Sequence, residues 1–184
     1  MKKIAIHFLF ALFFVPATML GACSYNSENI EGKTPYKVGQ AEEIRKEYYE
    51  SGKLRFEALY IADQIEGIET SYYENGNVWL ETPYKAGQRE GIEKSYYENG
   101  KVESETPYKA GTEEGIRKEY YENGNVKIET SYLAGRKEGT ERQYYEGGKL
   151  QLELVYAKGE IISGKHGDDT KLTNDEIREL NNVW

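Results

Sequence analysis

The sequence is poor in the residues that build most catalytic and metal sites. It contains one cysteine, two histidines and four prolines among 184 residues. A single cysteine excludes a disulfide framework within the chain and a zinc site made from cysteine pairs. The two histidines, His7 and His166, are far apart in sequence, which argues against a histidine-ligated metal or a catalytic triad. No phosphate-binding loop, nucleophile elbow or metal-binding helix motif is present, so we expect no catalytic residues, no cofactor and no metal.

Basic residues are also in the minority. There are 24 Lys and Arg against 32 Asp and Glu, which gives a formal net charge of −8. A nucleic-acid backbone rewards clustered Lys and Arg, so this balance argues against a nucleic-acid partner. What the chain has in abundance is tyrosine, with 17 residues, and glycine, with 19. Its length suggests one domain.

The first 22 residues differ from the rest of the chain. A short basic start, Met1 to Lys3, is followed by an apolar stretch from Ile4 to Leu20, which predicts a secretory signal at 1–22. The stretch ends in Leu-Gly-Ala-Cys, with the only cysteine at Cys23. This ending resembles the bacterial lipobox, in which the cysteine is lipidated and becomes the first residue. The alternative is an ordinary secretory signal with an incidental cysteine.

Lipidation at Cys23 would place the protein in the bacterial cell envelope. Two or more acyl chains, palmitate among them, suffice for stable membrane anchoring. By resemblance to lipoprotein sorting, Ser24 favours the outer membrane where the cell has one. Residues 23–33 are then the lipidated N-terminus and a flexible tether, because they show no apolar period.

The remainder is an internal repeat with a period of 24 residues. Tyr-Tyr pairs recur at this interval from Tyr48-Tyr49 to Tyr144-Tyr145, and Gly52, Gly76 and later glycines keep the same step. The predicted units are a half-unit at 34–42 and five full units at 43–66, 67–90, 91–114, 115–138 and 139–162.

Each unit predicts a β-hairpin, because it is too short for a helix pair and rich in Tyr and β-branched residues. A three-residue loop at 98–100, with Gly100 in the left-handed conformation, would pair Tyr96 with Val102 and Ile92 with Thr106. One face is then consistently apolar. Its expected members are Ile44, Ile68, Ile92 and Ile116, the first Tyr of each pair, Leu54, Val78, Val102, Val126 and Leu150, and the late tyrosines Tyr60, Tyr84, Tyr108, Tyr132 and Tyr156.

The opposite face is expected to carry the second Tyr of each pair and a row of glutamates. This row consists of Glu57, Glu81, Glu105, Glu129 and Glu153. The predicted fold is therefore all-β: an elongated single-layer antiparallel meander of about ten strands. Within the tail at 163–184, Thr173 and Glu176 fit a capping box that predicts a short helix at about 174–182, folded over the last strand to cover its open edge.

The repeat resembles that of a known family. Tyr-Tyr-Glu-Asn-Gly-Lys followed by Glu-Thr-x-Tyr-x-x-Gly-x-x-x-Gly is similar to the bacterial MORN-repeat-variant proteins, often labelled YwqK-type antitoxins, over residues 34–162. The resemblance implies a repeat protein, and the antitoxin label implies a toxin partner. Eukaryotic MORN repeats, a more distant resemblance, are linked to membrane lipids and scaffolding, and the acidity of this chain departs from that use.

The best candidate binding residues form periodic stripes. Tyrosine offers contact area at low entropic cost, and a glutamate row would steer a cationic partner. The alternatives are that the tyrosines only stiffen the sheet and that the glutamates are solvated. Trp79, expected opposite Tyr97, makes one repeat unlike the others. The predicted binding residues are Tyr49, Tyr73, Trp79, Tyr97, Tyr121, Tyr145, Glu81, Glu105 and Glu129.

The sequence therefore favours a non-catalytic, lipid-anchored envelope protein with a protein-binding surface along a Tyr/Glu face. Variable positions on that face would set partner specificity: Arg55, Trp79, Glu103, Lys127 and Gln151. Arg55 is expected opposite Tyr73 and Lys127 opposite Tyr145. The alternatives are an antitoxin or immunity protein that neutralises a toxin, and an enzyme acting on envelope glycans, which would need one unit with a special carboxylate.

Overall fold

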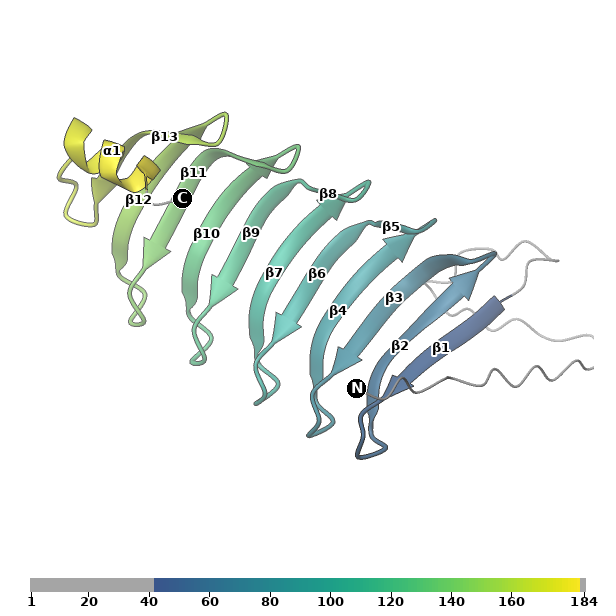
Figure 1. Ribbon diagram of the computed structural model, residues 1–184. Helices are drawn as coiled ribbons and strands as arrows, with labels where there is room; N and C mark the ends of the chain where they lie inside the picture. Colours follow the sequence, from purple (N-terminus) through teal and green to yellow (C-terminus); the bar gives the residue numbers. More distant parts are fainter. Residues whose placement is uncertain (1–41, 183–184) are drawn as a thin grey trace, which may run out of the picture. The chain divides into compact units, whose positions relative to one another are not determined.

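The structure is a computed structural model, and it describes residues 42–182. The predicted signal, Cys23, the tether and nearly all of the half-unit lie outside the described residues, as do Val183 and Trp184. The described unit is a single open antiparallel sheet with one C-terminal helix (Figure 1). Apart from two strands of two residues each, strands that follow one another in sequence are neighbours in the sheet, so the predicted all-β meander is confirmed.

The strands follow the hairpin repeats. Their bounds are β1 Glu42–Tyr48, β2 Leu54–Ile61, β3 Gln64–Tyr72, β4 Val78–Lys85, β5 Gln88–Arg89, β6 Gly91–Tyr96, β7 Val102–Lys109, β8 Thr112–Glu113, β9 Gly115–Tyr120, β10 Val126–Leu133, β11 Arg136–Tyr144, β12 Leu150–Ala157 and β13 Glu160–His166, followed by α1 Asn174–Asn182.

Two kinds of turn alternate along the sheet. Within a unit, the Gly100 N–H donates to the Tyr97 carbonyl (2.8 Å), the Tyr97 N–H donates to the Lys101 carbonyl (2.9 Å), and Gly100 has a φ of 81°. This is the predicted three-residue loop with glycine in the left-handed region. Between units, Ala86 and Gly87 both have positive φ values of 50° and 77°. Two such residues are what a two-residue type I′ hairpin turn requires.

The sheet has thirteen strands rather than about ten, for two reasons. Proline has no N–H to donate to a neighbouring strand, so the pairing breaks opposite Pro83 and Pro107. The first break separates the short β5 from β6, and the second separates β8 from β9. Ser131 occupies the equivalent position in the next unit, and β11 there is unbroken. The other addition is β13, which pairs with β12 in the region expected to begin the tail.

A β-bulge in every hairpin changes which residues share a face. Tyr96 pairs with Val102 as expected, but Ser95 pairs with Ser104, so Glu103 is an extra residue in its strand. Ile92 therefore pairs with Pro107 and not with Thr106, and the predicted register is wrong by one residue beyond the bulge. Because side chains alternate along a strand, every residue after the bulge changes face.

We call the two faces the ladder face and the threonine face. The ladder face carries the first tyrosine of each pair, the isoleucines and the row of glutamates with their basic partners. The threonine face carries the second tyrosines, the late tyrosines and a row of buried residues. That row includes Ala58, Thr82, Thr106, Thr130, Glu141 and Leu154. The late tyrosines and the glutamate row have thus exchanged the faces predicted for them.

The expected apolar face is not a core. Ile44, Ile68, Ile92 and Ile116 have exposed fractions of 53–63% on the ladder face. The most buried large side chains lie on the threonine face, where Leu154, Tyr156 and Ile161 form an apolar cluster. Without a second layer over the ladder face, burial depends on contacts between neighbouring strands.

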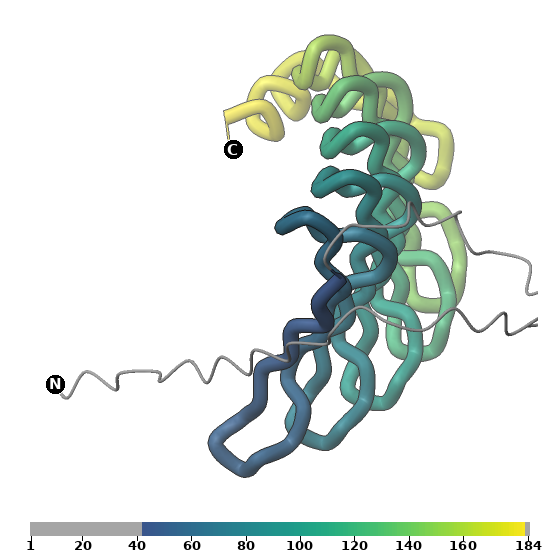
Figure 2. The backbone as a smooth tube through the Cα atoms, turned by 90° about the vertical axis from the view of Figure 1, so that its right-hand side faces the viewer, coloured from purple at the N-terminus to yellow at the C-terminus, as the bar shows by residue number. Residues whose placement is uncertain are grey.

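The C-terminal helix α1 covers the last strands as predicted. The Glu176 carboxylate accepts from the Thr173 N–H (2.7 Å) and the Glu176 N–H donates to Thr173 Oγ1 (3.3 Å), which completes the capping box. Ile177 and Leu180 pack on the apolar cluster. Figure 2 shows that the strands bow in one direction and that α1 lies on the concave side. Because the apolar cluster belongs to the threonine face, that face is the concave one.

Asn181 closes the edge of the sheet at Ile161. Its side-chain oxygen accepts from the Ile161 N–H (2.9 Å), and its amide nitrogen donates to the Ile161 carbonyl (3.0 Å). These are the two hydrogen bonds that a further strand would make. The amide therefore blunts an edge that could otherwise pair with another chain.

We predict that Gly91→Ala destabilises the sheet by about 1–3 kcal/mol. Gly91 has a φ of 119°, and a Cβ there would lie 3.1 Å from Pro83 Cγ. Urea unfolding followed by circular dichroism measures the effect. The matched control is Gly147→Ala, because a Cβ at Gly147 meets nothing within 4 Å. A loss at Gly91 no larger than that at Gly147 would contradict the assigned backbone.

Candidate functional site

The second tyrosines form a row along the threonine face beside the three-residue loops. Their hydroxyls donate to the backbone of the next unit: Tyr73 to the Tyr96 carbonyl (2.7 Å), Tyr97 to the Tyr120 carbonyl (2.6 Å) and Tyr121 to the Tyr144 carbonyl (2.7 Å). Each hydroxyl is therefore already satisfied within the protein, and these tyrosines remain partly exposed. Tyr49 makes the same contact with the carbonyl of Tyr72, and Tyr145 is 52% exposed at the end of the row.

The five variable positions are the bulge residues. Each is the extra residue in its strand, at the point where the register shifts. They are Arg55, Trp79, Glu103, Lys127 and Gln151. A bulge directs its extra side chain to the same side as its neighbour, so these residues stand on the threonine face beside the tyrosine row. The sequence repeat identified the positions, but the bulge that displays them was not foreseen.

Tyrosines and bulge residues from neighbouring units line two shallow depressions. One, of about 300 Å³, includes Tyr49, Arg55 and Trp79. The other, of about 250 Å³, includes Tyr97, Glu103 and Lys127. Trp79 has an exposed fraction of 45%, which is high for so large an apolar side chain. The two depressions therefore have different chemistry on the same backbone frame.

The predicted aromatic pairs are displaced by one residue. Leu80 pairs with Ser95, so Trp79 is not in register with Tyr97. Phe56 pairs with Ser71 and Ile128 with Gln143, which gives the same displacement for Arg55 with Tyr73 and Lys127 with Tyr145. Lys127 Nζ lies instead 5.9 Å from the ring centroid of Tyr121, in its own unit. The turns between units have two residues, whereas the predicted pairs assumed a loop with an odd number of residues.

The glutamate row lies on the opposite face from the second tyrosines. Lys46 Nζ lies 2.9 Å from the Glu57 carboxylate, and Lys94 Nζ lies 3.3 Å from that of Glu105. Tyrosine hydroxyls from the following unit add hydrogen bonds, such as Tyr96 to Glu81 (2.6 Å). Equivalent contacts are Lys118–Glu129 (3.5 Å), Arg142–Glu153 (2.8 Å), Tyr72–Glu57 (2.7 Å), Tyr120–Glu105 (2.9 Å) and Tyr144–Glu129 (3.3 Å). The row joins units to one another rather than presenting free carboxylates.

These contacts shift the pKa of the first tyrosines. The hydrogen bond to Glu57 is the main cause that raises the pKa of Tyr72 to about 12. Burial, followed by the hydrogen bond to a ladder carboxylate, raises the pKa of Tyr96 and of Tyr120 to about 12. The Tyr72 hydroxyl in turn lowers the pKa of Glu57, with a further contribution from Lys46. The raised pKa values keep these tyrosine hydroxyls protonated, and therefore able to donate, at neutral pH.

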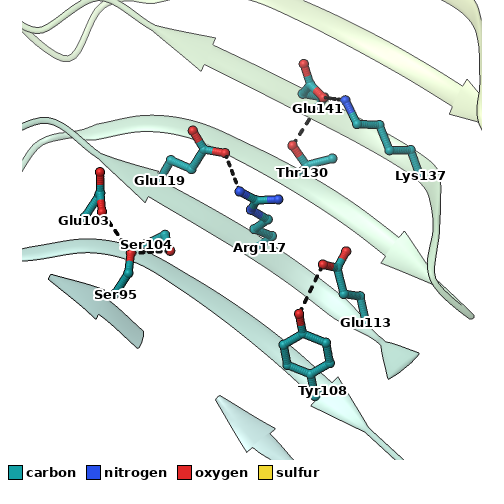
Figure 3. A network of polar contacts seen from close by, with 10 residues as sticks. All are labelled: Ser95, Glu103, Ser104, Tyr108, Glu113, Arg117, Glu119, Thr130, Lys137 and Glu141. Atoms are coloured by element: carbon teal, nitrogen blue, oxygen red, sulfur yellow. Dashed lines mark hydrogen bonds and ion pairs between the residues drawn. The ribbon is translucent and has the colours of Figure 1, made fainter. Parts of the chain in front are cut away.

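A polar network crosses the middle of the threonine face (Figure 3). Lys137 Nζ lies 2.7 Å from the Glu141 carboxylate, which also accepts from the Thr130 hydroxyl (3.2 Å). Arg117 pairs with Glu119 at 3.0 Å, and its buried Nε has no partner among residues 42–182. The threonine face therefore carries charged side chains as well as tyrosines and threonines.

Sequence reasoning missed a groove beside α1. It has a volume of about 460 Å³ and is lined by Tyr145, Leu152, Leu172 and Leu180, among others. His166 Nε2 lies 3.5 Å from Glu176 at this groove. The stripe of Ile177 and Leu180 predicted the helix over the last strand, but β13, which contributes Ile161 and His166 to this end of the sheet, was not predicted.

Within residues 42–182, no group of three or more His, Cys, Asp and Glu side chains is arranged to hold a metal ion. No helix within these residues is long and apolar enough to cross a membrane.

The comparison with protein families gives one clear result. The MORN repeat variant profile matches five times, at residues 44–62, 65–86, 89–110, 113–134 and 137–158, which together exceed half of the chain. The protein belongs to the MORN repeat variant family. Each match from the second onward spans one hairpin between two type I′ turns. Membership suggests a non-catalytic repeat protein. Comparison with curated proteins finds no match.

We predict that this MORN repeat protein loses stability as the pH rises from 10 to about 12. The pKa of Tyr72 is 10.0 when unperturbed and about 12 in the fold, so its contribution is complete below pH 10 and disappears as the folded hydroxyl ionises. The Glu57→Gln variant should lower the pKa of Tyr72 toward 10 and flatten this loss. Absorbance at 295 nm and urea midpoints across the range measure both. An unchanged Tyr72 titration in the variant would contradict the assigned cause.

Proposed function

We propose that the protein is a lipid-anchored component of the bacterial cell envelope, and that it binds a protein partner along the threonine face. The observation that carries this proposal is the position of the variable residues. Arg55, Trp79, Glu103, Lys127 and Gln151 occupy the bulges of an otherwise periodic sheet. Hydrogen bonds that recur in every unit fix the backbone, and the side chains at the bulges differ in charge and size from one unit to the next.

Several properties of this surface suit protein recognition. Tyr and Trp supply rigid contact area and are enriched among residues that dominate interface energies. Trp79 has the most contact area to offer among the bulge residues, and it lines the same depression as Arg55 and Tyr49. The concave bow of the face would let a partner contact several units at once. The ladder glutamates suit this role less well, because binding there would compete with their ion pairs and tyrosine hydrogen bonds.

The nature of the partner distinguishes two versions of the proposal. An antitoxin or immunity protein would cap a toxin within the envelope, whereas a scaffold would bind a resident envelope protein. A neighbouring gene for a secreted toxin favours the first. The enzyme alternative needs a deep site with a distinctive carboxylate. Glu69, the carboxylate whose pKa is raised by burial, lines neither of the depressions described above nor the groove beside α1.

We predict that a photo-crosslinking amino acid at Trp79 or Lys127 captures a discrete partner in cells. The same group at Ile92, which is 53% exposed on the ladder face, is the matched control. Trp79→Ala should reduce partner affinity by about 2 kcal/mol or more if Trp79 dominates the interface. Equal crosslinking from both faces would contradict the threonine-face assignment.

We also predict that Cys23→Ser releases the protein from the membrane fraction or leaves it uncleaved. Acylation at Cys23 would be lost, and with it the anchor. Fractionation of cells and metabolic labelling with a palmitate analogue measure this result. A Ser variant that is processed, labelled and membrane-bound like the parent would contradict the lipoprotein assignment.

A further inference from the structure

The threonine face contains a charged position that recurs in every unit. From the first unit to the fifth it is occupied by Arg45, Glu69, Glu93, Arg117 and Glu141. In two units a basic residue four positions earlier neutralises the glutamate: Arg89 lies 3.8 Å from Glu93 and Lys137 lies 2.7 Å from Glu141.

The same two basic side chains also cover the late tyrosine of the unit that contains the glutamate. The Arg89 guanidinium lies 3.9 Å from the ring centroid of Tyr108, and Lys137 Nζ lies 4.9 Å from that of Tyr156. The molecule therefore builds one arrangement twice: a carboxylate, a cation and a tyrosine ring. Attraction of a cation to the face of a tyrosine adds to the ion pair.

A threonine completes this arrangement from the preceding strand. The Thr82 hydroxyl donates to the Glu93 carboxylate (2.9 Å), and the Thr130 hydroxyl donates to that of Glu141 (3.2 Å). Figure 3 shows the second case, in which Thr130 and Lys137 converge on Glu141. Both glutamates thus have a basic partner and a hydroxyl partner, and Glu141 also accepts from the Gln143 side-chain amide (2.8 Å).

At Glu69 both partners are replaced by aliphatic residues. Ile65 stands where the two arrangements above have Arg89 or Lys137, and Ala58, which is 2% exposed, stands where they have Thr82 or Thr130. Among residues 42–182, the Glu69 carboxylate has neither a hydrogen bond nor an ion pair. Burial and the nearby Glu93 raise the pKa of Glu69, which agrees with a carboxylate that lacks a counter-charge. The ring of the corresponding late tyrosine, Tyr84, has no cation over it in this part of the chain either.

We propose that Glu69 and Tyr84 form a vacant receptor for a basic side chain of the protein partner. The incoming ammonium or guanidinium group takes the place that Arg89 occupies beside Glu93 and that Lys137 occupies beside Glu141. This inference rests on the proposed function, because it names the chemistry that the threonine face recognises. Arginine suits the site best, since its planar group pairs with a carboxylate and stacks on an aromatic ring.

The surrounding charges allow this occupant. Glu69 and Glu93 contribute two negative charges and Arg89 one positive charge, and Arg89 is already held by Glu93 and Tyr108. One further cation would balance the group. The net charge of the chain, −8, would also favour the approach of a basic partner.

The test is an NMR titration of the labelled full chain with N-acetyl-arginine methylamide and its lysine counterpart. Citrulline methylamide, which has nearly the same shape as the arginine probe and no charge, is the control. We expect saturable shifts at Glu69 and Tyr84 with the cationic probes, and at least tenfold weaker binding in Glu69→Gln. The conservative change keeps the size of the side chain, and an unchanged spectrum elsewhere shows that the variant folds.

Ile65→Arg provides a second test that does not depend on removing the carboxylate. It supplies the missing cation internally, so it should block the probes and raise the melting temperature, as expected if the Arg89 arrangement is reproduced. Citrulline shifts equal to those of arginine, or equal shifts at Glu105 on the ladder face, would overturn the proposal. If a partner crosslinks at Trp79 and binds Glu69→Gln and Ile65→Arg as tightly as the parent, the proposal for Glu69 and Tyr84 is wrong. The proposal that the partner binds the threonine face is then still supported. If nothing crosslinks at the threonine face while the probes bind at Glu69, the proposed function fails instead.

Discussion

The Tyr-Tyr pair is the contact on which the one-layer sheet depends. In each interior unit the first hydroxyl donates backward, as Tyr96 does to Glu81, and the second donates forward, as Tyr97 does to the Tyr120 carbonyl. A sheet with both faces open cannot bury enough apolar side chains to hold its strands together by packing alone. Two adjacent residues that point to opposite faces can join three consecutive units, and this explains why the pair recurs with the period of the repeat. Stability then comes from interfaces between neighbours, as in other linear repeats.

The contacts that join the units restrict most positions, and the bulge is the position where the sequence can vary. A residue inside the ladder must fit both neighbouring strands, whereas the extra residue of a bulge lacks a direct partner. Arg55, Trp79, Glu103, Lys127 and Gln151 differ in charge and size without altering the pairing on either side. At the end of the sheet no further unit follows in the described residues, and Asn181 supplies the two hydrogen bonds that such a unit would have made to Ile161.

The sequence predicted features that depend on local geometry. The period of 24, the loop at 98–100 and the capped helix at Asn174–Asn182 all follow from residues close together in the chain, and all are confirmed. The faces beyond the bulge were wrong, because a bulge at Glu103 is set by how two strands pack and leaves no residue-type signature in the hairpin. The same shift moved the glutamate row away from the second tyrosines. β13 was missed because its sequence, unlike the five units, lacks the Tyr-Tyr pair.

Specificity in such a protein has to come from departures from the period. A partner that contacts only the repeated features would bind equally well in several registers along the sheet, since units separated by 24 residues present the same groups. A single position that breaks the pattern fixes one register. Trp79 is such a position at the bulges, and Glu69, flanked by Ile65 and Ala58 where other units have a base and a threonine, is another on the same face and in the same unit. Their coincidence in the second unit means that an aromatic anchor and an unpaired charge lie on one hairpin, and together they would place a partner at one point along the sheet.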